Sequence, residues 1–92
     1  MIEKEFVMEN RLGLHARPAA LFVQTGSRFK CGVKVAKESD GEKIVVNGKS
    51  VMGLMMLAVA CGESISLMLD GPDEKEALEA FKALFAEKFH ED

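Results

Sequence analysis

Segments with strand periodicity alternate with segments of helical periodicity along the whole chain, and this order restricts the possible folds. Four segments have strand character, through alternation of apolar and polar residues or through β-branched residues: 2–8, 32–35, 43–46 and 64–69. Three segments carry apolar residues at spacings of three and four: 16–27, 51–59 and 72–89. The order βαββαβα with short connections predicts an α+β open-faced sandwich, in which three helices cover one face of a four-stranded, mainly antiparallel sheet.

Turn and capping residues mark the joins between these segments. The turn signal at residues 39–41 predicts that the two middle strands form a hairpin. Ser50 is a natural N-cap for the second helix. Asp70 or Gly71 can cap the third helix, with Pro72 in its first turn. This helix carries six apolar residues on the face that we expect to be buried: Ala77, Leu78, Phe81, Leu84, Phe85 and Phe89. Four polar residues fall on its solvent side: Lys75, Glu79, Lys82 and Glu87.

The length and charge of the chain exclude several classes of protein. Ninety-two residues predict a single domain, residues 1–92, with one modest core. The net charge of −3 argues against a nucleic-acid-binding protein, which would carry a basic face. Residues 1–5 contain no apolar signal-peptide core. The longest apolar run, residues 54–61, is far shorter than the roughly 20 residues that cross a bilayer. We therefore expect a cytoplasmic protein that binds neither membrane nor nucleic acid.

The residues that could bind a metal ion are few and widely separated. Cys31 and Cys61 do not form a CxxC pair, and the only histidines are His15 and His90. The first loop also lacks the cysteine pair that a small metal-binding βαββαβ domain requires. No Ser/His/Asp set and no P-loop is present. We therefore expect no metal, no cofactor and no self-sufficient catalytic site.

The stretch LHARPA, residues 14–19, is the best candidate for a chemical function. Pro18 fits the first turn of a helix, because it lacks a backbone N–H. His15 then falls at the helix N-terminus, where free amides and the helix dipole favour an anion. A neutral imidazole is a good nucleophile near neutral pH. The backbone amides of Ala16 and Arg17 could receive phosphoryl oxygens, and the Arg17 guanidinium could add a forked positive charge. The alternative is that His15 merely starts the helix and Arg17 is a solvated side chain.

Residues 10–19, NRLGLHARPA, resemble the phosphorylation-site signature of the HPr family, the histidine-containing phosphocarriers of the bacterial phosphoenolpyruvate:sugar phosphotransferase system. The length and element order resemble the same family over the whole chain. The resemblance implies sheet order 1-4-2-3 and a monomeric phosphoryl carrier rather than an enzyme. It implies that enzyme I, charged by phosphoenolpyruvate, phosphorylates Nδ1 of His15, with Arg17 as its electrostatic partner. Enzyme IIA domains would then receive the phosphoryl group for sugar uptake.

A second informative stretch, NGKSVMG, covers residues 47–53. The residue types alone give Ser50 a capping role and would place Met52, Met55 and Met56 in the core. The short helix cannot bury all its apolar residues, so some apolar surface stays exposed, and flexible Met suits several partners. The stretch resembles the regulatory-serine region of HPr proteins that are substrates of HPr kinase/phosphorylase. This implies that Ser50 is phosphorylated and that Met52 and Met55 help to form the docking surface.

Two related functions remain as alternatives. A nitrogen-branch HPr paralogue shares the histidine signature but serves regulatory partners instead of sugar permeases. A purely regulatory module would act through phosphorylated Ser50 as the partner of a catabolite-control transcription factor. Residues 48–53 favour the sugar branch, and the presence of His15 argues against regulation as the sole function.

Overall fold

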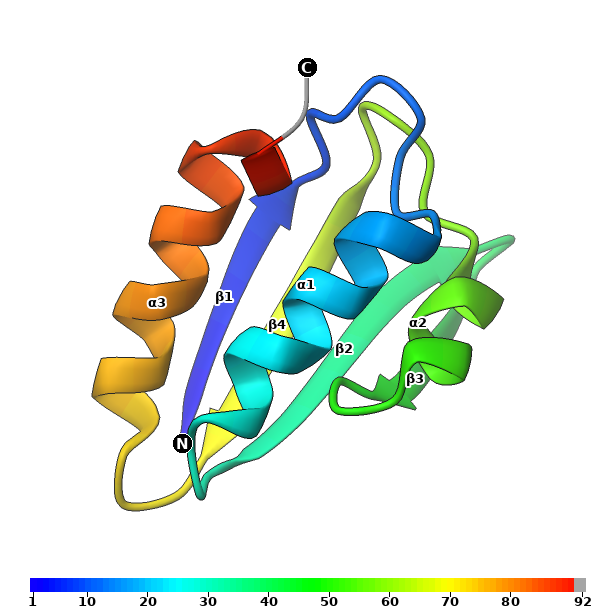
Figure 1. Ribbon diagram of the computed structural model, residues 1–92. Helices are drawn as coiled ribbons and strands as arrows, with labels where there is room; N and C mark the ends of the chain where they lie inside the picture. The colour runs from blue at the N-terminus through cyan, green and yellow to red at the C-terminus, as the bar shows by residue number, and fades with distance from the viewer. Residues whose placement is uncertain (91–92) are drawn as a thin grey trace.

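All four strands lie in one antiparallel sheet with the order β1-β4-β2-β3. The computed structural model describes residues 1–90, and its strands are β1 (Ile2–Val7), β2 (Gly32–Ser39), β3 (Glu42–Asn47) and β4 (Ser64–Asp70). Three helices cover one face of the sheet, as Figure 1 shows: α1 (Ala16–Ser27), α2 (Val51–Leu57) and α3 (Glu74–Ala86). A 3-10 turn, η1 (Lys88–His90), follows α3. The predicted α+β open-faced sandwich and its βαββαβα order are confirmed. The last two residues of the predicted domain lie outside the described residues.

The alternation of residues in β4 explains how the sheet separates core from solvent. Ile65, Leu67 and Leu69 are buried on the helix-covered face, whereas Ser64 and Ser66 belong to the open face. Because β4 lies between β1 and β2, its apolar side chains form the centre of the core. Burial of this apolar face against the helices is the main favourable contribution to folding.

Phenylalanine rings connect the helices to each other and to the sheet edge. The Phe22 and Phe81 ring centroids lie 4.5 Å apart and join α1 to α3. The Phe6 ring of β1 stacks on Phe85 at a centroid distance of 4.3 Å. Phe89, predicted on the helical stripe of α3, is buried against Phe85 but lies beyond the end of the helix, in η1. The chain turns there because the φ angles of residues 88–90 are positive.

Several element ends differ from the sequence prediction. The first strand ends at Val7 instead of residue 8. The hairpin strands extend to a two-residue turn at Asp40 and Gly41, whose positive φ angles of 53° and 81° suit the twist of a tight hairpin. The second helix ends at Leu57, two residues earlier than the periodicity predicts, because Ala58 adopts a left-handed conformation with φ 54°.

The predicted start of α3 is wrong by several residues. The helix begins at Glu74 with Asp73 as its N-cap residue, so neither Asp70 nor Gly71 is the cap and Pro72 precedes the first turn. The predicted burial pattern of the helix is correct. Four members of its apolar face are buried and Leu78 is half-buried, whereas the four predicted solvent residues are exposed. The helix prediction was therefore right in its faces and wrong in its first turn.

A long-range contact explains the shifted start of α3. The Asp73 carboxylate makes no capping bond within its own helix. It accepts hydrogen bonds from the backbone amides of Lys30 (2.8 Å) and Cys31 (2.9 Å), just before β2. The Lys30 bond is the main cause that lowers the pKa of the Asp73 carboxyl. Asp73 therefore ties the start of α3 to the start of β2 instead of capping the helix.

Candidate functional site

His15 is the N-cap residue of α1, as predicted. Its backbone is extended, with φ −91° and ψ −167°, and its carbonyl accepts the first bond of the helix from the Ala19 amide at 3.0 Å. The imidazole is half-buried and makes no capping hydrogen bond to the helix. The amides of Ala16 and Arg17 are in the first turn, where a helix offers its N–H groups no carbonyl partner. The backbone therefore presents donors beside the imidazole, in the arrangement that helix N-termini use to bind anions.

The rest of the first turn favours the same use. Pro18 is buried within the first turn, and it adds no competing donor because it has no N–H. Arg17 is exposed, so its guanidinium can reach a bound anion from solvent. The first turn contains no acidic residue that would neutralise the positive end of the helix. The three residues that the sequence proposed for phosphoryl binding, His15, Ala16 and Arg17, thus lie together at the start of α1.

The loop before His15 is packed directly against the segment that follows α2. The Leu14 amide donates to the Val59 carbonyl at 2.8 Å. Gly13 has φ 70°, and a Cβ there would lie 2.2 Å from the same carbonyl oxygen. Within the loop, the Gly13 amide donates to the Asn10 carbonyl at 3.0 Å. Glycine is required here by both the backbone angle and the closeness of Val59.

Asn10 anchors the other end of the loop, and reasoning from the sequence gave it no separate structural role. It is only 1% exposed, and its Nδ2 donates to the Lys88 carbonyl in η1 at 2.9 Å. A buried side-chain amide is stable only where it is hydrogen-bonded. Its bonding partner, Lys88, is distant in the sequence, so only its place at the start of the signature could have indicated that Asn10 is important.

Ser50 caps α2, as predicted from its type and position. Its Oγ accepts a hydrogen bond from the Gly53 amide at 3.1 Å. The Asn47 side chain accepts from the Lys49 amide at 2.9 Å and shapes the turn that precedes the cap. Ser50 precedes the first residue of α2, and the segment that contacts the His15 loop follows the last residue of α2. The helix between these two points is about 10 Å long. Ser50 and the attachment of the His15 loop are therefore at opposite ends of α2.

The methionines of α2 form an exposed apolar surface, called here the methionine patch (Met52, Met55 and Met56). Met52 is 71% exposed, Met56 is 78% exposed and Met55 is 44% exposed, whereas the leucines at positions 54 and 57 are buried. The prediction that the helix leaves methionine surface exposed is confirmed. Because α2 packs against α1 (Figure 1), this surface belongs to the same side of the fold as the His15 helix.

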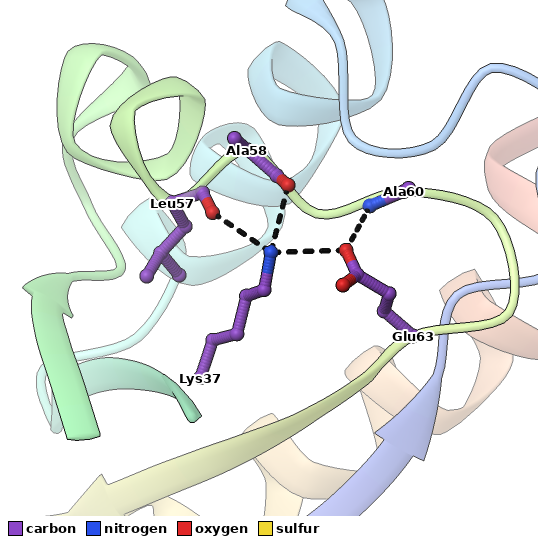
Figure 2. A network of polar contacts seen from close by, with 5 residues as sticks. All are labelled: Lys37, Leu57, Ala58, Ala60 and Glu63. Carbon is purple, nitrogen blue, oxygen red and sulfur yellow. Dashed lines mark hydrogen bonds and ion pairs between the residues drawn. The ribbon is translucent and has the colours of Figure 1, made fainter. Parts of the chain in front are cut away.

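A polar network beside this region was not predicted. Figure 2 shows the Lys37 ammonium of β2 reaching the carbonyls of Leu57 (3.3 Å) and Ala58 (2.9 Å). The same nitrogen lies 2.9 Å from Oε1 of Glu63, which also accepts from the Ala60 amide at 2.6 Å. The bonds from Ala60 and Lys37 lower the pKa of the Glu63 carboxyl. Lys37 therefore closes the C-terminal end of α2 and holds the loop that follows it.

Potential metal ligands, thiols and apolar helices within residues 1–90 also bear on function. Within residues 1–90, no group of three or more His, Cys, Asp or Glu side chains is placed to hold a metal ion. Both thiols are free, and burial is the main cause that raises the pKa of the Cys31 thiol. Among the described helices, none has the length and apolar character needed to span a membrane.

Comparison with known proteins identifies the family of this chain. The family model described as the PTS HPr component phosphorylation site matches residues 2–87. The chain belongs to the HPr family. It is 45% identical over 92 residues to the phosphocarrier protein HPr of Treponema pallidum, with both chains fully covered. It is also 50% identical over 88 residues to the HPr-like protein Crh of Halalkalibacterium halodurans, covering 96% of this chain and 99% of the relative.

The fold agrees with a solved member of the family. The structure of HPr from Thermoanaerobacter tengcongensis superimposes with a TM-score of 0.86 at 46% identity, covering 100% of this chain and 99% of that chain. Members of the HPr family are phosphocarriers of the phosphotransferase system rather than catalysts. Membership therefore implies phosphotransfer for this chain and leaves its individual partners to be tested.

Proposed function

We propose that this chain accepts a phosphoryl group on Nδ1 of His15 from phosphorylated enzyme I and passes it to enzyme IIA domains for sugar uptake. The main observation in support is the position of His15 as the N-cap of α1, beside first-turn amides that have no intrahelical partner. The lone pair of Nδ1 forms the new N–P bond while the bond from phosphorus to enzyme I breaks. The amides of Ala16 and Arg17 receive the phosphoryl oxygens, and the Arg17 guanidinium stabilises their charge. Positioning and charge stabilisation are the main needs of phosphoryl transfer.

A labelling experiment tests this function directly. The protein is incubated with enzyme I and labelled phosphoenolpyruvate, and we expect an acid-labile label that is lost in His15→Ala. His90→Ala is the matched control, because His90 is exposed in η1 and takes no part in the site. That variant keeps the label. A wild-type protein that takes up no label, or a His15→Ala variant that remains labelled, contradicts the proposal.

We further propose that HPr kinase/phosphorylase phosphorylates Ser50 and docks on Met52 and Met55. Supporting this, Ser50 begins α2 and the adjoining methionines are exposed. A phosphate would add about −1.5 to −2 charge at the start of α2, beside the methionine patch. We expect this charge to slow phosphorylation of His15 by weakening enzyme I docking. Incubation with ATP and the kinase should label the wild type but not Ser50→Ala, and Ser27→Ala serves as a control at an exposed serine of α1. Equal labelling of Ser50→Ala contradicts this assignment.

The Crh relatives favour a second candidate function. The chain is as similar to HPr-like protein Crh as to proteins named HPr. In this function, Ser50-phosphorylated protein would bind a catabolite-control transcription factor. Titration of that factor with phosphorylated and unphosphorylated protein tests it, and equal affinity of the two forms contradicts it.

We also propose that the carrier acts as a cytoplasmic monomer. A solved structure of HPr from Thermoanaerobacter tengcongensis is described as a dimer, so the oligomeric state needs direct measurement. Light scattering over a range of concentrations should give a mass near 10.1 kDa. A mass twice that value at all concentrations contradicts the monomer.

A further inference from the structure

Lys37 occupies a position where the strand pattern calls for an apolar residue. In β2, Val33 and Val35 are buried on the helix-covered face, and Lys37 follows them on the same face. Its side chain is only 11% exposed. A charge at such a position is stable only when it is paired and hydrogen-bonded. The lysine is therefore held by its specific partners rather than by solvent.

The partners of the Lys37 ammonium lie at the C-terminal end of α2 and in the loop between α2 and β4. Two of them are carbonyls at the end of α2, which lack intrahelical donors and lie at the negative end of the helix dipole. The third is Glu63, which in turn binds the Ala60 amide. Ala58 and Ala60 are thus held by one network (Figure 2). Val59 lies between them in the sequence.

Val59 is the residue that contacts the His15 loop. Its carbonyl accepts from the Leu14 amide at 2.8 Å, immediately before the N-cap residue of α1. The network is attached to the same loop at a second point, because the Met8 amide donates to the Glu63 carbonyl at 2.8 Å. Lys37 and Glu63 thus hold the residues on either side of Val59, and Val59 binds Leu14. Leu14 lies immediately before the N-cap residue of α1, whose first-turn amides follow.

We propose that Lys37 and Glu63 are positioning residues for phosphoryl transfer at His15. They fix the Val59 carbonyl, which fixes Leu14 and so aligns His15 with the amides of Ala16 and Arg17. Because the Glu63 side chain is 42% exposed, solvent screens the ion pair and limits its direct contribution to stability. The importance of this pair lies in the loop that it holds. The effect on transfer rests on the proposed function, whereas the effect on the Leu14 hydrogen bond does not.

The test compares variants that break the network with one that preserves its donors. Lys37→Met removes the ammonium, and Lys37→Arg keeps a donor for the α2 carbonyls. Glu63→Gln removes the charge but keeps an acceptor for Ala60, and it serves if Lys37→Met does not fold. Lys82→Met is the matched control, because Lys82 forms an exposed ion pair with Glu79 at 3.4 Å.

Three measurements separate positioning from general destabilisation. They are hydrogen exchange of the Leu14 amide relative to Leu67 in β4, the NMR shifts of the His15 ring, and kcat and KM for phosphoryl acceptance from enzyme I. We expect Lys37→Met to accelerate exchange at Leu14 but not at Leu67, to move the His15 shifts, and to lower kcat about tenfold with KM nearly unchanged. Lys37→Arg should restore most of kcat, Glu63→Gln should be intermediate, and Lys82→Met should resemble the wild type.

Several results would overturn the inference. One is a folded Lys37→Met variant with unchanged Leu14 exchange, His15 shifts and kcat. Another is equal acceleration of exchange at Leu14 and Leu67, which would indicate global destabilisation only. A third is an altered Leu14 bond with unchanged kcat. If the wild type accepts no phosphoryl group, the proposed function fails, and the exchange and shift measurements still decide whether the network positions His15.

Discussion

The backbone amide of Leu14 donates to the carbonyl of Val59, so the residue before His15 is bonded to the segment that follows α2. This bond connects the backbone next to His15 to the backbone next to α2, the helix that carries the methionine patch. A partner that docks on α2 would therefore meet His15 in a defined orientation. Four predictions follow from contacts around this attachment and at the ends of the helices.

Gly13→Ala should displace the His15 loop. A Cβ there would lie 2.2 Å from the Val59 oxygen, and alanine is also strained at φ 70°. We expect a loss of about 1–3 kcal/mol in the free energy of unfolding and a large loss of phosphoryl acceptance. Gly41→Ala is the control, because Gly41 has φ 81° but no atom within 4 Å of the added Cβ. Urea denaturation and transfer rates would contradict the prediction if the two variants behaved alike.

Ser50 can be changed in a way that separates its capping role from its proposed regulatory role. Ser50→Ala removes the acceptor for the Gly53 amide and should cost about 1 kcal/mol of stability. Ser50→Asp keeps a capping acceptor, so its stability should stay close to that of the wild type. Its added charge should still slow phosphorylation of His15. Thermal denaturation and enzyme I kinetics give the two readouts, and a fast Ser50→Asp variant would count against charge as the regulatory signal.

Asn10→Ala should weaken the attachment of the site loop to η1. The change removes a buried donor and leaves the Lys88 carbonyl without this bond. We expect a cost of about 1–3 kcal/mol in the free energy of unfolding. Asn47→Ala is the matched control, because the Asn47 side chain is exposed and its bond to the Lys49 amide is local. Equal stability of the two variants in urea would show that the Asn10 anchor is unimportant.

Three carboxylates should make the protein less stable in acid. The Ala60 amide lowers the pKa of Glu63, the Lys30 amide that of Asp73, and the Gly71 amide that of Glu74. In the unfolded chain the carboxyl pKa is about 3.9 for Asp and about 4.3 for Glu. Because the folded pKa values are lower, the stabilisation is complete above those unfolded values and is lost as the pH falls through the folded ones.

Urea denaturation between pH 7 and pH 3 measures this loss. The free energy of unfolding should be nearly constant near neutral pH and fall as the pH drops below about 4.5. Asp73→Asn should show a shallower fall, because one of the three titrating groups is gone. An Asp73→Asn variant with the same acid slope as the wild type would show that Asp73 does not contribute.

Local sequence patterns predicted the parts of this fold that depend on neighbouring residues. The alternation in residues 64–69 predicted β4, and Ser50 was predicted as a cap because its partner is three residues away. His15 was placed at the helix start because Pro18 marks the first turn. Its role as the phosphorylated residue remains a prediction from the family resemblance, which the labelling experiment will test.

The features that the sequence did not predict depend on partners far along the chain. The carboxylate of Asp73 binds the amides of residues 30 and 31, which are more than 40 positions away in the sequence. The pairing of Lys37 with Glu63 has no local signal, since the contact exists only after β2 and the loop before β4 come together. Periodicity and capping rules describe one element at a time, so such contacts are visible only in the folded chain.

The burial of Phe89 and the Asn10 bond to Lys88 make the loop before His15 dependent on the turn that follows α3. Trimming of the chain past residue 89 would remove a core side chain and, one residue further, the carbonyl that accepts from Asn10 in the loop before His15. Partial trimming would thus produce a protein that still contains the histidine yet relays phosphoryl groups poorly. The C-terminal turn makes carrier function sensitive to damage at the opposite end of the sequence.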